Sequence, residues 1–125
     1  MKTNSITNVE KSEIREVADL IKEAEDGIKY WEERITDNGA KSMILSYKQE
    51  IKDLKEGRYI RGKVGLIPIC RVADVIATLE AEIEYFQEKP CEPVIEEIIS
   101  DNEKDISFLK ERLSNYYASH PLARH

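Results

Sequence analysis

The sequence predicts an all-α protein, an antiparallel four-helix bundle made of two tandem-duplicated helical hairpins related by a pseudo-two-fold axis. Three observations lead to this prediction. Apolar residues recur at helical spacing in four segments, short turns separate the members of each pair, and the chain resembles itself at a fixed offset. Amphipathic helices joined by short turns bury their apolar faces by closing on one another. The length of 125 residues suits a single domain.

The first hairpin begins with a segment whose apolar residues alternate at spacings of three and four, the a/d pattern of a helical seam. Thr7 and Glu10 have the spacing of a capping box at its start. The stretch Thr36-Asp37-Asn38-Gly39 is expected to end this helix, with Gly39 or Asn38 supplying a residue of positive φ. The predicted seam of the first helix consists of Ile14, Val17, Ile21, Ala24, Ile28, Trp31 and Ile35, and that of the second of Ala40, Ile44, Tyr47, Ile51 and Leu54.

The second hairpin repeats this pattern. Pro68 suits the first turn of a third helix, Pro90 and Pro93 bracket the next turn, and His120-Pro121 closes a fourth helix. Asn102 replaces an apolar residue in the fourth seam, where a buried amide typically sets the register of neighbouring helices. The predicted organisation is repeat 1 over about 8–57, a linker over 58–67, repeat 2 over about 68–118 and a tail over 119–125.

The repeat is visible when residues 14–56 are aligned with residues 69–111 without a gap. Of 43 aligned positions 14 are identical, where a composition this biased would give roughly 3 to 5 by chance. Two unrelated amphipathic hairpins would explain the apolar matches. They would not explain the identities Asp19/Asp74 and Tyr30/Tyr85, so the sequence favours duplication. The two copies can pack within one chain or exchange between two chains.

The composition of the chain argues against several classes of function. A net charge of −6, with 19 basic residues interspersed among 25 acidic ones, argues against nucleic acid as a partner. The polar start of the chain does not resemble a signal peptide, and no apolar run is long enough to span a membrane. We therefore expect a cytoplasmic protein. Cys70 and Cys91 lack the spacing of a disulfide framework or a zinc site, so no metal or other cofactor is expected.

Catalysis is not expected either. His120 and His125 both lie near the end of the chain, and no Ser or Cys has a His partner that the sequence would place beside it. The Glu-x-x-His motif of di-iron bundles is missing. The leading hypothesis is a non-enzymatic module that binds a protein partner, such as an inhibitor, adaptor or accessory subunit. A homodimer is one option for its oligomeric state.

Two groups of residues are candidate binding sites. Tyr30 and Tyr85 occupy equivalent positions outside the a/d seams, and exposed aromatic residues often anchor protein interfaces. The alternative is that both rings lie along the flank of the bundle with only the hydroxyl groups exposed. The linker carries Arg58, Tyr59, Arg61 and Lys63 beside flexible glycines, an arrangement suited to a small anionic ligand such as a nucleotide. The alternative there is a solvated crossover whose charges offset the acidic helices.

Overall fold

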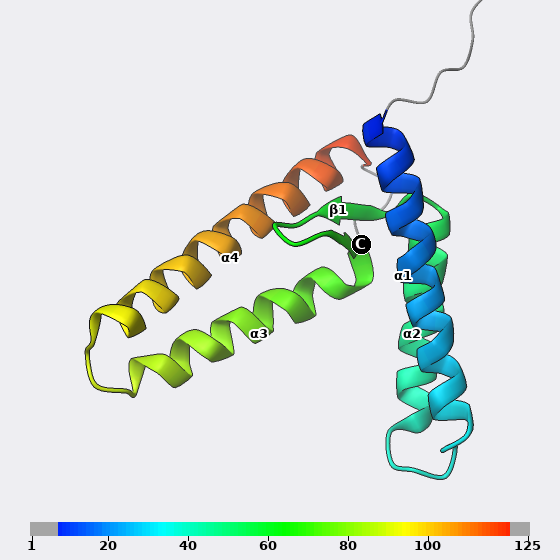
Figure 1. The fold of residues 1–125 in the computed structure, drawn as a ribbon, viewed down its shortest axis with the longest axis horizontal. Coiled ribbons are helices and arrows are strands. Elements are labelled where there is room, and N and C mark those ends of the chain that lie inside the picture. Colours follow the sequence, from blue (N-terminus) through cyan, green and yellow to red (C-terminus); the bar gives the residue numbers. More distant parts are fainter. Residues whose placement is uncertain (1–7, 121–125) are drawn as a thin grey trace, which may run out of the picture. The chain divides into compact units, whose positions relative to one another are not determined.

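The computed structural model describes residues 8–120, and these form four helices and one two-stranded sheet (Figure 1). The helices are α1 (Asn8–Glu32), α2 (Ala40–Lys55), α3 (Ile69–Gln87) and α4 (Pro93–Ser119). The strands are β1 (Tyr59–Arg61) and β2 (Leu66–Pro68). The prediction of a mostly helical chain is confirmed. The sheet was not predicted; it lies in the predicted linker except for Pro68, the last residue of β2. Thr7 and residues 121–125 of the predicted tail lie outside the described residues.

The chain divides into two compact units, one ending at Tyr59 and one beginning at Ile60. In the first unit α1 packs alongside α2 as a helical hairpin (Figure 1). The apolar side chains most deeply buried among its described residues are Ala24, Ala40, Ile44 and Leu54. Most other seam residues, such as Val17 and Ile51, are only half-buried because a pair of helices covers one side of each seam.

The first turn begins earlier than the apolar spacing predicts. α1 ends at Glu32, and turns follow it in which the N–H of Arg34 donates to the carbonyl of Trp31 and that of Asp37 to the carbonyl of Arg34. Ile35 therefore lies outside the helix and is 46% exposed, so its predicted place in the seam is wrong. Gly39 has φ +85° and precedes α2, which confirms the predicted left-handed residue.

The second unit contains α3 and α4, which pack alongside each other (Figure 1). It also contains a cluster of buried apolar residues. Val72 of α3 is completely buried and lies in one cluster with Ile60, Leu109 and Tyr116. Partly buried side chains surround this cluster, namely Ile67, Ile69, Val75, Ile76, Leu79, Phe108, Leu113 and Tyr117. Pro93 opens α4 and His120 follows its last residue, as expected. Pro68, expected in the first turn of the third helix, is instead the last residue of β2 and directly precedes α3.

Part of the predicted linker forms a β-hairpin on this core. β1 and β2 pair with each other, and the N–H of Gly62 donates to the carbonyl of Gly65 across the turn at 2.8 Å. Ile60 of β1 and both Leu66 and Pro68 of β2 are buried. The helical periodicity gave no indication of these strands because each is only three residues long.

Each helical hairpin is thus established within its own unit. The closure of both hairpins into one four-helix bundle stays a prediction. No helix among residues 8–120 combines the length and the apolar character needed to cross a lipid bilayer.

Candidate functional site

Tyr30 lies near the end of α1 with 48% of its surface exposed. Its ring meets that of Trp31 edge to face, with centroids 5.2 Å apart and planes at 84°. The guanidinium carbon of Arg34 lies 3.7 Å from the centroid of the Tyr30 ring, and Nη1 of Arg34 donates to the Tyr30 carbonyl at 3.0 Å. An exposed tyrosine is thus held between an aromatic ring and a cation.

Tyr85 has the same surroundings at the equivalent place in α3. It is 55% exposed, and its ring meets that of Phe86 at a centroid distance of 5.1 Å and an angle of 80°. The ammonium nitrogen of Lys89 lies 4.4 Å from the centroid of the Tyr85 ring. Both predicted contact residues therefore belong to an exposed cluster of two aromatic rings and one cation, which we call the tyrosine cluster of each hairpin.

Contacts within each tyrosine cluster restrict its ring. A cation over an aromatic face contributes about 0.5–1 kcal/mol at an exposed site, and an edge-to-face pair of rings contributes a similar amount. A ring fixed in this way loses less conformational freedom when a partner covers it. The clusters therefore present ordered aromatic surface.

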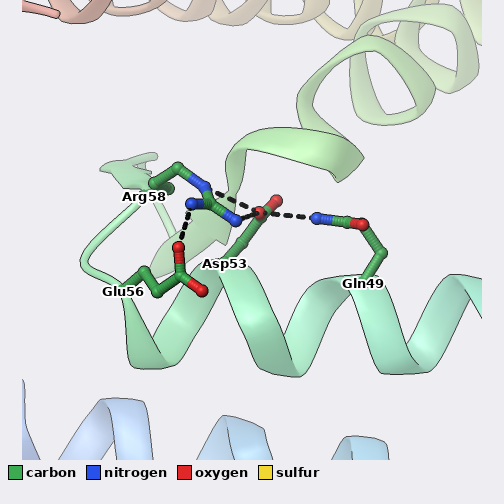
Figure 2. Close-up of polar contacts among 4 residues, drawn as sticks. All are labelled: Gln49, Asp53, Glu56 and Arg58. Carbon is green, nitrogen blue, oxygen red and sulfur yellow. Dashed lines mark hydrogen bonds and ion pairs between the residues drawn. The ribbon is translucent and has the colours of Figure 1, made fainter. Parts of the chain in front are cut away.

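Arg58, the first of the predicted anion ligands, is committed to carboxylates of its own unit (Figure 2). Its Nε and Nη2 atoms lie 3.1 Å and 3.0 Å from Oδ1 of Asp53, and its Nη1 contacts Glu56. The hydrogen bond to Asp53 is the largest cause of a raised pKa of Arg58. Gln49 donates to the same Asp53 oxygen at 3.0 Å from the other side.

Tyr59 and Lys63 also have contacts within their own units. The hydroxyl of Tyr59 donates to Oε2 of Glu13 at 2.9 Å. The ammonium of Lys63 lies 2.7 Å from Oδ1 of Asp105, and the hydrogen bond to that carboxylate raises the pKa of Lys63. Arg61 is exposed on β1.

These contacts bear on the anion hypothesis. Arg58 and Tyr59 belong to the first unit, and Arg61 and Lys63 to the second. An anion at Arg58 or at Lys63 would have to compete with the carboxylates already bound there. Binding of a small anion stays a prediction. The role of Asp53 was missed, although an acid five residues before an arginine at a helix end is a recognisable signal.

The residues considered for catalysis are also engaged in contacts. The ring of His120 stacks on Tyr116, with centroids 4.2 Å apart and planes at 14°, and its Nδ1 lies 2.9 Å from the Tyr116 carbonyl. The thiol of Cys91 donates to Oε1 of Glu96 at 2.8 Å, which raises the pKa of Cys91 and disfavours the nucleophilic thiolate. Residues 8–120 contain no group of three or more His, Cys, Asp or Glu side chains placed to hold a metal ion.

A feature that sequence reasoning missed lies on the first hairpin. An open groove of about 370 Å³ follows the first part of α2 and the end of α1. Three apolar and three charged residues line it, namely Ile35, Ile44 and Leu45, and Glu32, Lys41 and Lys48. The available signal was Leu45, an apolar residue that does not fit the a/d spacing of α2.

Comparisons of this chain with protein-family models, with curated proteins and with solved structures find no match. The function is therefore inferred from the side chains described above. Among these, the two tyrosine clusters combine exposure, aromatic surface and a defined geometry.

Proposed function

We propose that the protein is a non-enzymatic binding module that contacts a protein partner through Tyr30 and Tyr85. The observation that carries this proposal is the exposure of both tyrosine residues, at 48% and 55%, in clusters that each combine two aromatic rings and one cation in a similar geometry. Tyrosine, tryptophan and arginine are the residue types most enriched among energetically dominant interface positions. The tyrosine cluster of the first hairpin contains all three.

The presence of one cluster on each hairpin favours a partner that is contacted at two points. Joining two weak contacts in one molecule makes the second contact intramolecular, so the overall affinity exceeds that of either contact. An inhibitor, an adaptor or an accessory subunit would use such a surface. We further propose that the protein is cytoplasmic and has no catalytic activity.

Two finer features of the fold belong to this proposal, namely descent of the two hairpins from one ancestor and their closure into a four-helix bundle. Matching tyrosine clusters at positions 55 residues apart support the duplication. Half-buried seam residues such as Val17, Ile28 and Ile83 support the bundle, because a second helical layer would cover their exposed sides.

The proposal is tested by placing the photoreactive amino acid p-benzoylphenylalanine at position 30 or 85 and irradiating cells that express the variant. We expect both positions to cross-link to one and the same protein. Glu25 and Glu80 provide matched control positions, because they are equivalent in the two repeats and are exposed on the same helices. Cross-linking from the control positions should be weak.

The affinity of the cross-linked protein is then measured with purified chains. Tyr30→Ala and Tyr85→Ala should each weaken binding by about tenfold or more, as expected for dominant interface residues. Tyr30→Phe and Tyr85→Phe should have smaller effects because they keep the ring. Equal cross-linking from the tyrosine and control positions, or unchanged affinity of the double alanine variant, would show that the proposal is wrong.

A further inference from the structure

The groove on the first hairpin leaves apolar side chains in contact with solvent. Leu45 is 67% exposed and Ile35 is 46% exposed. Four apolar side chains are deeply buried among the described residues of this unit, which is few for a stable pair of helices. Covering Leu45 and Ile35 would therefore stabilise the hairpin.

The charged residues that α2 contributes to the groove are both basic. Lys41 and Lys48 are exposed on the same side of the helix as Leu45, at spacings of four and three residues. Neither lysine has a hydrogen bond or an ion pair with another of the described residues. The α2 face, defined as Lys41, Leu45 and Lys48, thus combines one apolar side chain with two available positive charges.

The positions of α4 that are equivalent in the repeat have the opposite charge. Adding 55 to the numbers of the α2 face gives Glu96, Ser100 and Glu103, which we call the α4 face. Glu96 and Glu103 are exposed, and Ser100 is half-buried. In the α2 face two lysines flank a large apolar residue, whereas in the α4 face two glutamates flank a small serine.

We propose that the α2 face of one chain binds the α4 face of a second copy, and that the second copy returns the same contact. Each lysine of one face meets a glutamate of the other whether the helices run parallel or antiparallel, because both faces have their charges seven residues apart. The small Ser100 leaves space for Leu45. The two reciprocal contacts close a two-fold dimer.

Charge complementarity is what identifies the second copy as the occupant. Two α2 faces would repel each other, as would two α4 faces, so the interface selects the pairing of unlike hairpins. This inference rests on the proposed pairing of the two hairpins and adds that the pairing is between chains. It is independent of the tyrosine clusters, so its failure would leave the cross-linking experiment unaffected.

The experiment measures molecular mass by sedimentation velocity over a range of concentrations. The unchanged chain should form a species of twice 14.5 kDa. The variant Lys41→Glu/Lys48→Glu has two acidic faces, and the variant Glu96→Lys/Glu103→Lys has two basic faces. Each alone should dimerise at least about tenfold more weakly, because attraction becomes repulsion in both reciprocal contacts.

Mixing the two variants distinguishes pairing between two chains from pairing within one chain. In the mixed dimer every acidic face meets a basic one, so dimerisation should return to the level of the unchanged chain. Pairing within one chain would instead leave the unchanged protein monomeric and would allow no rescue by mixing, and either result would overturn the proposal. Rescue also shows that both variants fold.

Lys22→Glu/Lys29→Glu is the matched control. It changes the net charge by the same amount, at the same seven-residue spacing, on the exposed side of α1. Dimerisation of this variant should stay within about twofold of the unchanged chain, since its charges lie outside both faces. A loss as large as that of Lys41→Glu/Lys48→Glu would attribute the effect to net charge and would contradict the assigned interface.

Discussion

Asp53 has a carboxylate that is 4% exposed at the end of α2, and two side chains hold it in place. Arg58 approaches Oδ1 with two nitrogens, and Gln49 donates to the same oxygen. A buried carboxylate is tolerated where charge and hydrogen bonds compensate for the lost hydration. Arg58 also donates its backbone N–H to the Asp53 carbonyl at 2.8 Å, so this residue joins the end of α2 to β1.

Cys91 provides a prediction at the scale of one residue. Its hydrogen bond to Glu96 raises the pKa of the thiol, so less thiolate is present at a given pH and alkylation is slower. Replacing Glu96 by glutamine removes the negative charge and should speed the alkylation of Cys91 by iodoacetamide at pH 8. The rate is measured by peptide mass spectrometry at low protein concentration, where chains are separate.

The difference between the two proteins should shrink as the pH rises above the raised pKa, because the thiol is then ionised in both. The alkylation rate of Cys70 serves as the internal control and should not change. Equal alkylation rates of Cys91 at pH 8 in the unchanged chain and in the Glu96→Gln variant would contradict the assigned hydrogen bond.

Within each hairpin, one pair of equivalent positions joins the two helices by different chemistry. A Cβ atom added to Gly27 would lie 2.6 Å from the ring of Tyr47, so the ring of α2 packs against the glycine of α1. Adding 55 to both numbers gives Glu82 and Asn102. There the side-chain amide of Asn102 donates to Oε1 of Glu82 at 2.9 Å. Equivalent positions therefore contact each other in both hairpins, through a glycine and an aromatic ring in the first and through a hydrogen bond in the second.

This correspondence predicts that the pair can be transplanted. Gly27→Glu alone should destabilise the protein by about 1–3 kcal/mol, because the new side chain meets the Tyr47 ring. Tyr47→Asn alone should destabilise it as well, because packing is lost. The double variant should be more stable than the sum of the single effects predicts, by about 1 kcal/mol. The free energies of unfolding are measured by urea denaturation.

A cycle that combines Gly27→Glu with Ser46→Asn is the control, since Ser46 is an exposed neighbour of Tyr47 in sequence and lies outside the α2 face. Its two effects should add. Additive effects of Gly27→Glu and Tyr47→Asn would show that the two hairpins are not equivalent at this contact.

At the scale of the whole molecule, the two units differ in how much apolar surface they bury. The second unit has a core around the completely buried Val72, covered by the β-hairpin that contributes Ile60 and Ile67. The first unit has a seam in which small residues, Ala24 and Ala40, account for part of the burial. Small side chains remove less apolar area from water and contribute less stability.

Separate fragments should show this difference. We expect residues 60–125 to keep helical circular dichroism and to unfold cooperatively on heating, because their core lies within the fragment. Residues 1–59 should lose helicity gradually, as short helices do without sufficient packing. Circular dichroism at 222 nm against temperature is the measurement. Equally cooperative unfolding of both fragments would contradict this account.

Local patterns in the sequence were sufficient to predict four helices in a mostly helical chain. The spacing of apolar residues specifies which face of each helix is buried, and residues such as Gly39 and Pro93 act on the backbone next to them. Ile35 was misplaced because apolar spacing can continue past the last helical hydrogen bond.

Only the tertiary structure decided which charged side chains are paired with one another and which charged and aromatic side chains are exposed. The linker formed a β-hairpin because two strands of three residues gain stability by covering a core, which no local period records. Arg58 and Lys63 are bound to carboxylates, whereas Lys41 and Lys48 are available on the α2 face. The sequence by itself determined where each helix lies, since helix formation depends on near neighbours. The folded chain determined which side chains remain exposed for binding, since exposure depends on residues far apart in the sequence.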